Sequence, residues 1–139
     1  MSTQTIRTMG PGYVPAYQAS GTPYVTSSAA PGTGASPPYA HITFPSVTRF
    51  IEVTNVGNVQ SDSLRVGFTA NGIKATETAN YITIPVSGST GRLELRCKEL
   101  FISSDTANTN NFSLVAGVTG ILPMQFPVLT GSTGYEGVG

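Results

Sequence analysis

The sequence predicts an all-β protein, built as an antiparallel β-sandwich. Between residues 41 and 129, short segments of alternating apolar and polar side chains are separated by stretches rich in Gly, Ser, Asn and Asp, which are typical of turns. No long segment in this range repeats apolar residues with the helical period. Segments with one apolar and one polar face suit two sheets that share one core.

Each expected strand follows from its own pattern. Alternation directs the apolar side chains of a segment to one face, while a short run that is mostly apolar, such as 100–103, fits a strand buried on both faces. The stretch "RLELRCK" at 92–98 alternates most regularly, so Leu95→Asp is expected to prevent folding by burying an unpaired charge. The expected strands, with the side chains predicted to face the core, are 41–44, 48–56 (Ile51, Val53), 63–69 (Leu64, Val66, Phe68), 81–86 (Ile82, Ile84, Val86), 92–98 (Leu93, Leu95, Cys97), 100–103 and 112–118 (Phe112, Leu114, Ala116, Val118).

The connections and the last apolar segment complete the predicted domain, residues 41–129. An Asn-Gly pair at 71–72 predicts a tight turn. The segment 121–126 is apolar but contains a proline, so it predicts either a last edge strand or an exposed apolar patch for a partner, and we favour the strand. Residues 130–139 are expected to form a Gly-rich tail.

The first 40 residues predict an extended N-terminal arm. Residues 1–40 hold six prolines, five glycines and a single charged residue, and they show no sustained helical or strand period. Tyrosine is the exception, because a solvating linker has no need of large rings that are apolar with a polar tip. We expect the tyrosines to anchor the arm on a partner subunit, and the alternative is a tail with incidental tyrosines. The expected interface residues are Tyr13, Tyr17, Tyr24 and Tyr39.

The low and balanced charge of the chain limits the kinds of partner that it is expected to bind. Only 10% of the residues are charged, with seven Lys and Arg balancing seven Asp and Glu, against about 25% in an average protein. Nucleic acids and anionic membranes attract clustered basic residues, so neither is expected as the main partner. A surface with so few charges gives a free monomer little colloidal protection, which favours packing against neighbouring subunits.

Export and membrane signals are missing from the chain as given. Its start lacks a basic region followed by an apolar run, and no stretch approaches the roughly 18 apolar residues of a membrane span. The single cysteine, Cys97, permits neither an internal disulfide nor a cysteine-based metal site. We therefore expect the chain to be made and assembled in a cytosol.

No enzymatic activity is expected, and no catalytic, cofactor-binding or metal-binding residue is assigned. The only histidine, His41, is expected at the boundary between arm and domain, and no GxSxG elbow accompanies it. Glu52 and Glu94 fall on polar strand faces beside Arg49 and Arg96, which predicts cross-strand charge pairs rather than a catalytic pair. No loop has the acidic density of a calcium site.

The stretch "VTRFIEVTNVG … LRVGFTANGIK … YITIPV … GRLELRCKELFISS … FSLVAGVTGI", within residues 47–121, resembles small β-sandwich proteins of virus particles. These are the single-domain minor capsid, vertex and decoration proteins of icosahedral DNA viruses and tailed phages. The resemblance lies in the pattern of apolar and polar residues and in the order of the strands, without a diagnostic motif. It implies a jelly-roll-like sandwich, with an Ig-like one as the other form, symmetric oligomers, and terminal arms that lace neighbouring subunits together.

Two functions are expected, in order of preference. The first is an accessory capsid protein (decoration, cement or vertex protein) that stabilises the shell through its arm and symmetric contacts. Its partners would be the major capsid protein and further copies of itself, and its location the virion, assembled in the host cytoplasm. The alternative is a carbohydrate- or receptor-binding β-sandwich module of a tail fibre or adhesin. That alternative needs exposed aromatic rings, and the domain offers no tryptophan and one tyrosine, Tyr81.

Overall fold

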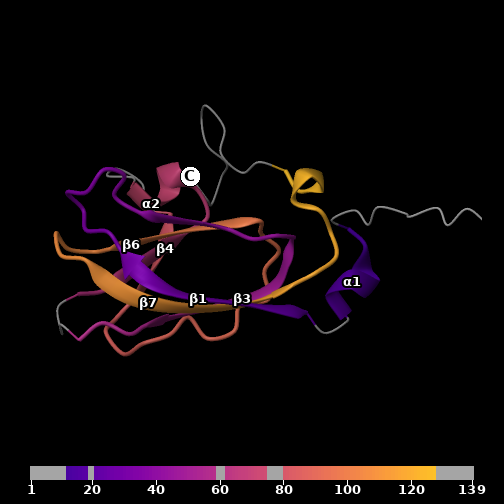
Figure 1. Cartoon of the computed structure of the whole chain (residues 1–139), viewed down its shortest axis with the longest axis horizontal. Coiled ribbons are helices and arrows are strands. Elements are labelled where there is room, and N and C mark those ends of the chain that lie inside the picture. The colour runs from indigo at the N-terminus through magenta and orange to yellow at the C-terminus, as the bar shows by residue number, and fades with distance from the viewer. Residues whose placement is uncertain (1–11, 19–20, 59–61, 75–79, 128–139) are drawn as a thin grey trace, which may run out of the picture.

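Two antiparallel sheets face each other across one core, as the sequence predicts (Figure 1). The structure, a computed structural model, describes residues 12–18, 21–58, 62–74 and 80–127. Its elements are α1 (Val14–Gln18), β1 (Thr22–Ala30), β2 (Ala40–Thr43), β3 (Thr48–Asn55), β4 (Leu64–Gly67), α2 (Ala70–Lys74), β5 (Tyr81–Ile84), β6 (Glu99–Ser104), β7 (Asn110–Val118) and the 3-10 helix η1 (Pro123–Gln125).

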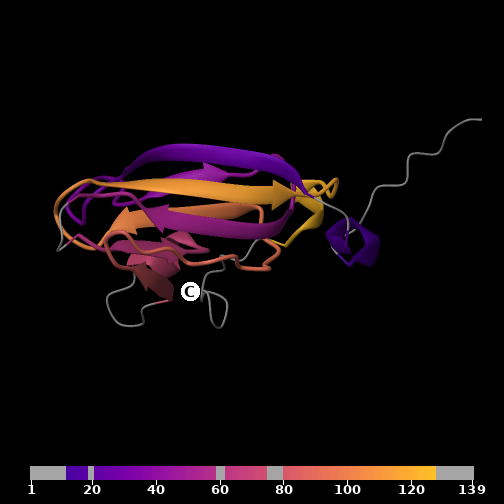
Figure 2. The same cartoon turned by 90° about the horizontal axis from the view of Figure 1, so that it is seen from below.

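The first sheet has the order β1-β7-β3 and the second the order β2-β6-β4-β5. Figure 2 shows β1 at one edge of the first sheet, beside β7 and then β3. On the far side of β3, a segment at 89–93 adds two isolated bridges, which pair Ile51 with Leu93 and Thr54 with Ser89. Ile51 and Leu93 each donate their N–H to the other's carbonyl, at 2.9 and 2.8 Å.

The strand pairs are nested along the chain. β1 pairs with β7, β2 with β6, β3 with the segment 89–93, and β4 with β5, always antiparallel. The innermost pair is therefore local in sequence, whereas the outermost pair joins the first strand to the last. The second sheet and the β3–β7 ladder then hold neighbouring pairs together.

The core forms where both sheets direct their apolar faces inward, and most of it follows the predicted alternation. In β7, Phe112, Leu114 and Ala116 are at most 1% exposed, and Ile51 and Val53 of β3 are fully buried opposite them. The predicted strand at 100–103 is confirmed as buried on both faces, because every residue from Leu100 to Ser104 in β6 is buried. Leu64 and Val66 of β4 complete the same cluster.

One strand was not expected in the first 40 residues. The expectation of no strand there is wrong for Thr22–Ala30, which is β1 and pairs with β7 over its whole length. A short helix, α1, also lies in this range, with Pro15 in its first turn, where the missing N–H costs nothing. The inward side chains of β1 are mostly polar or small. The two faces of the strand therefore differ little in polarity, and the alternation cannot be recognised from the sequence. An extended arm over the rest of residues 1–40 stays a prediction.

The prediction of a regular strand at 92–98 is wrong beyond Leu93, and Leu95 is 38% exposed. The backbone turns at Leu95, whose N–H donates to the Leu93 carbonyl at 2.9 Å, and Thr48 contacts the segment on both sides of this turn. The Thr48 hydroxyl donates to the Leu95 carbonyl at 2.9 Å and accepts from the Cys97 N–H at 3.0 Å. The backbone is thereby bent around Thr48, which turns Leu95 outward while Cys97 remains buried, as expected.

Three further predictions differ from the structure. The expected turn at 71–72 lies within the short helix α2, and Ile82 in the edge strand β5 is 39% exposed rather than core. The expected last strand at 121–126 contains η1 instead, because Pro123 begins a helical turn better than it continues a ladder. Val128, Leu129 and the expected tail at 130–139 lie outside the described residues.

Leu114→Ala is expected to lower the free energy of unfolding by about 2–5 kcal/mol, because it leaves a cavity at the centre of the core. Leu95→Ala is the matched control and is expected to cost less than about 1 kcal/mol, since Leu95 is partly exposed. Urea unfolding followed by circular dichroism measures both. Equal losses in the two variants would contradict the outward orientation of Leu95.

Candidate interaction surfaces

Two of the four expected interface tyrosines pack against the sandwich itself. The Tyr24 ring meets Phe44 edge-on, with 5.3 Å between ring centroids and 77° between planes. The Tyr39 ring meets Phe101 in the same way, at 5.2 Å and 81°. Both rings are only partly exposed, so much of their apolar surface already has a partner within the chain.

The other two tyrosines lie at α1: Tyr13 directly precedes the helix, and Tyr17 is part of it. The carbonyl of Tyr17 accepts a hydrogen bond of 2.6 Å from Arg49 Nε, and the Arg96 guanidinium lies 5.4 Å from the centre of the Tyr17 ring. These contacts dock α1 on the start of β3 and on the bent segment that follows Leu93. Tyr13 is 48% exposed and is the most accessible of the four. A role of all four tyrosines at a partner interface stays a prediction.

Exposed apolar side chains gather at the end of the sandwich that carries α1. Figures 1 and 2 place α1 and η1 at the same end of the sandwich. Lys98 Nζ donates to the Phe126 carbonyl at 3.1 Å, which ties the segment after η1 to this end. We call the following set the α1-end surface: Tyr13, Val14, Leu95, Leu122 and Met124, of which Met124 is 84% exposed. For residues 121–126 the sequence predicted either a last edge strand, which we favoured, or an exposed apolar patch. The second prediction describes Leu122 and Met124 better.

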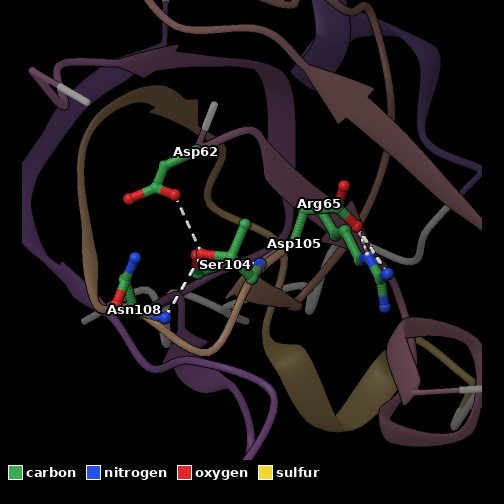
Figure 3. Close-up of polar contacts among 6 residues, drawn as sticks. Asp62, Arg65, Ser104, Asp105 and Asn108 are labelled. Atoms are coloured by element: carbon green, nitrogen blue, oxygen red, sulfur yellow. Dashed lines mark hydrogen bonds and ion pairs between the residues drawn. The ribbon is translucent and has the colours of Figure 1, made fainter. Parts of the chain in front are cut away.

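The opposite end is held by buried polar groups, some of them drawn in Figure 3. Asp62 is 1% exposed, and its Oδ1 accepts from the Thr106 hydroxyl at 2.9 Å. Its carbonyl accepts from Nδ2 of both Asn55 and Asn110, at 3.1 and 2.8 Å. These bonds join the loop around Asp62 to the end of β3, to the start of β7 and to the loop that contains Thr106.

An ion pair extends this network toward the second sheet. Arg65 on β4 pairs with Asp105 directly after β6, through both Nε and an Nη nitrogen (Figure 3). The same guanidinium lies 4.7 Å from the centre of the Tyr81 ring. Tyr81 is therefore covered on one side by a cation of its own chain, which limits its use as a stacking platform.

The expected charge pairs differ from those observed. Glu52 accepts from the Ser89 hydroxyl at 3.1 Å, and Glu94 pairs with Arg92 at 2.7 Å, while Arg49 and Arg96 contact Tyr17. Glu52 thus bonds across strands to a hydroxyl rather than to an arginine. Sequence spacing could not have identified α1 as the site where the two arginines meet.

His41 lies in β2 and is bound on two sides. Its Nε2 lies 2.9 Å from Glu99 Oε2, and its ring stacks on Phe101 with 4.4 Å between centroids and 7° between planes. Within the described residues, no group of three or more His, Cys, Asp or Glu side chains is arranged to hold a metal ion. In the same part of the chain, no helix is long and apolar enough to cross a membrane.

A shallow groove of about 160 Å³ crosses the outer face of the first sheet. Its lining comes from β1, β3 and β7, and includes Val25, Glu52, Thr54 and Val115. Pockets for drug-sized ligands measure about 300–1,000 Å³, so this groove has room for only a small group or a single side chain.

Sequence comparison assigns no family to the chain. No family model matches it, and no curated protein has a matching sequence. The proposals below therefore depend on the geometry of the chain itself.

Asn110→Ala is expected to lower the free energy of unfolding by about 1–3 kcal/mol, because it removes a hydrogen bond from the buried carbonyl of Asp62. Asn111→Ala changes the exposed neighbour on the same strand and is expected to cost less than about 0.5 kcal/mol. Thermal unfolding by calorimetry compares the two. A stable Asn110→Ala variant would show that the network is dispensable for the fold.

Burial raises the pKa of the Cys97 thiol from 9.0 to about 11, with a hydrogen bond to Thr48 opposing the shift and the charge of Glu99 adding to it. Above pH 9 the unfolded chain loses the thiol proton while the folded chain keeps it. The stability of the folded chain is therefore complete below pH 9 and falls as the pH rises from 9 to 11, by about 2 kcal/mol. Urea unfolding at several pH values is expected to show this loss, and Cys97→Ala is expected to lack it. An identical pH profile for both chains would contradict a raised pKa.

Proposed function

We propose that the chain is an accessory protein of a virus particle, a vertex or decoration protein with a jelly-roll fold. The single observation that supports it best is the nested order of strand pairs, in which the first strand meets the last and each further pair lies inside the previous one. A jelly roll is such a long hairpin, rolled so that alternate pairs lie in two facing sheets. Counting the segment 89–93 as a strand gives each sheet four members, β1-β7-β3 with 89–93 and β2-β6-β4-β5.

Charge and surface composition favour an assembled state over a free monomer. The chain has zero net charge and 10% charged residues, so electrostatic repulsion keeps its copies apart only weakly. The described exposed apolar side chains gather mainly at the α1-end surface rather than at random. A gathered apolar patch of this kind is typical of a docking site.

The α1-end surface is the place where we expect the particle to be contacted. Tyr13 directly precedes α1 and Val14 begins it, while Leu122 directly precedes η1 and Met124 lies within it. Two arginines and a lysine hold these elements in place, so the surface is preorganised on the sandwich. The partners we propose are the major capsid protein and further copies of the chain, in a virion assembled in the host cytoplasm, with no role for nucleic acid or a membrane.

A carbohydrate- or receptor-binding module is the second candidate, because jelly rolls also serve as lectin domains. The groove of about 160 Å³ on the first sheet would be its binding site. Its lining holds a carboxylate and hydroxyls but no aromatic ring among the six residues that form it. The ring platforms that glycans favour are therefore missing from this groove, and the particle role is preferred.

The proposed function is tested by asking where the chain is in cells that produce it. Lysates are separated on a density gradient, and an antibody against the purified chain is used to follow it. We expect the chain to sediment with particles and to stay with them after a high-salt wash, because apolar contacts are not screened by salt. A chain found only in the soluble fractions, or one that binds a glycan array as the isolated protein, would favour the second candidate.

Met124→Asp is expected to reduce the occupancy of the chain on particles by tenfold or more, which corresponds to about 1.4 kcal/mol. The physical reason is that a carboxylate replaces an apolar anchor in a water-excluding contact. Val56→Asp is the matched control, because Val56 is 51% exposed but follows β3 at the opposite end of the sandwich. Quantitative mass spectrometry of purified particles gives both occupancies. Equal occupancies would remove the α1-end surface from the proposal.

A further inference from the structure

The first sheet ends in a long edge strand, β1. It runs over nine residues, Thr22–Ala30, whereas the edge strands of the second sheet, β2 and β5, have four each. Only one side of β1 is paired, with β7, and no other described residue pairs with its outer side. An edge of this length presents a row of free backbone groups to any strand that can approach it.

The outward backbone groups of β1 follow from the pairing on the other strands. Ile51 and Val53 of β3 direct their N–H and carbonyl groups away from β7, to Leu93 and Thr90. Since hydrogen-bonding direction alternates along an antiparallel strand, Glu52 and Thr54 must bond to β7 at Val115 and Ser113.

The same alternation carries across β7. Ala116 and Leu114 then bond to their partners on β1, which are Tyr24 and Thr26. The residues between and after them point their N–H and carbonyl groups to the open side. These residues are Val25, Ser27 and Ala29.

Two prolines limit the usable part of this edge. Pro23 has no N–H to offer, and neither does Pro31, whose carbonyl already accepts from the Ser104 N–H at 2.9 Å. Between them lies the stretch Tyr24–Ala30, whose centre is Ser27. The free edge is therefore symmetric about one residue.

The devices that normally protect an edge strand are missing between the two prolines. Natural edges carry lysines, other charges, internal prolines or bulges. The stretch "YVTSSAA" has no charge and no proline, and β1 pairs with β7 without a shift in register. Its outward side chains are small except for Val25, which is 68% exposed.

We infer that β1 pairs antiparallel with β1 of a second copy, about a two-fold axis at Ser27. Ser27 would face Ser27 of the other copy, and Val25 would face Ala29. In this register every free N–H and carbonyl of the three residues finds a partner, whereas the next register in one direction would place Pro23 opposite Ala29, and in the other direction Pro31 opposite Val25, and neither proline has an N–H to donate. This inference names the symmetric contact of the proposed function and depends on that function only for its place in a particle.

The side chains suit a contact between identical copies. A residue on a two-fold axis meets itself, so a charge there would repel its own copy, and Ser27 carries none. The resulting sheet would run continuously from β3 of one copy, through the two β1 strands, to β3 of the other. The groove on the outer face of the first sheet would then lie beside its copy, since Val25 lines it.

Charge exchange at Ser27 tests the inference on the purified full chain. Sedimentation velocity is expected to show a monomer–dimer equilibrium for the unmodified chain and for Ser27→Ala. Ser27→Lys and Ser27→Glu are each expected to be monomeric, because like charges meet at the axis, and a one-to-one mixture of the two is expected to restore the dimer. Circular dichroism confirms that each variant is folded. An unmodified chain that stays monomeric up to about 1 mM, or a mixture that stays monomeric, would overturn the inference.

Amide hydrogen exchange provides a measurement without substitution. On dilution from dimer to monomer, the N–H groups of Val25, Ser27 and Ala29 are expected to lose protection, whereas those of Tyr24, Thr26 and Ser28 are expected to keep it because they bond to β7. Uniform loss along β1 would mean that the whole strand opens, and would overturn the pairing. Neither experiment contains particles, so a failure here leaves the gradient test of the proposed function unaffected. A chain that dimerises but is absent from particles would separate the two in the opposite sense.

Discussion

The structure depends on one strand, β7, which pairs with the first strand of the sandwich on one side and with β3 on the other. Its inward side chains, Phe112, Leu114 and Ala116, are buried against both neighbours and the second sheet. Because β7 comes last among the strands, it closes the core. Until β7 is in place, β1 has no strand partner, and the edge of β3 that β7 pairs with lacks its backbone hydrogen bonds.

Side chains take over where the ladders end, and they do so differently at the two ends. At the α1 end, the Thr48 hydroxyl holds the bent backbone near Cys97, and arginines hold α1. At the opposite end, buried amides of Asn55 and Asn110 hold the carbonyl of Asp62. The polar end is closed on itself, while the other end leaves its apolar side chains exposed. The two ends of the sandwich therefore differ in character, and this difference is the reason for proposing that the chain contacts a particle through its α1 end.

The strands that were predicted well from the sequence are 48–56, 100–103 and 112–118. Their side chains line the core between the two sheets, and burial there requires apolar residues, which the sequence shows directly. The segment 92–98 was predicted wrongly because alternation shows which side chains tolerate burial, not whether the backbone continues a regular ladder. Thr48 bonds to Cys97 through both its N–H and its hydroxyl, and the backbone between Leu93 and Cys97 turns instead. β1 was missed for the opposite reason, since it is held by backbone bonds to β7 and needs few apolar side chains. The α1-end surface is made of segments that lie far apart in the sequence, so it could not be predicted as a whole. Only one part of it was anticipated, by the alternative prediction of an exposed apolar patch at 121–126.

The pairing of β1 with β7 has a consequence for synthesis of the chain. A ribosome releases β1 long before it has made β7, so the strand must wait in solution without its partner. An apolar, β-prone segment in that position would associate with other nascent chains. The composition of β1, rich in Ser, Thr and Ala, keeps it soluble through this interval. The weak apolar character that made the strand hard to predict from the sequence therefore protects the chain against misfolding on the ribosome. The strand becomes stable only later, when its backbone bonds to β7 can form.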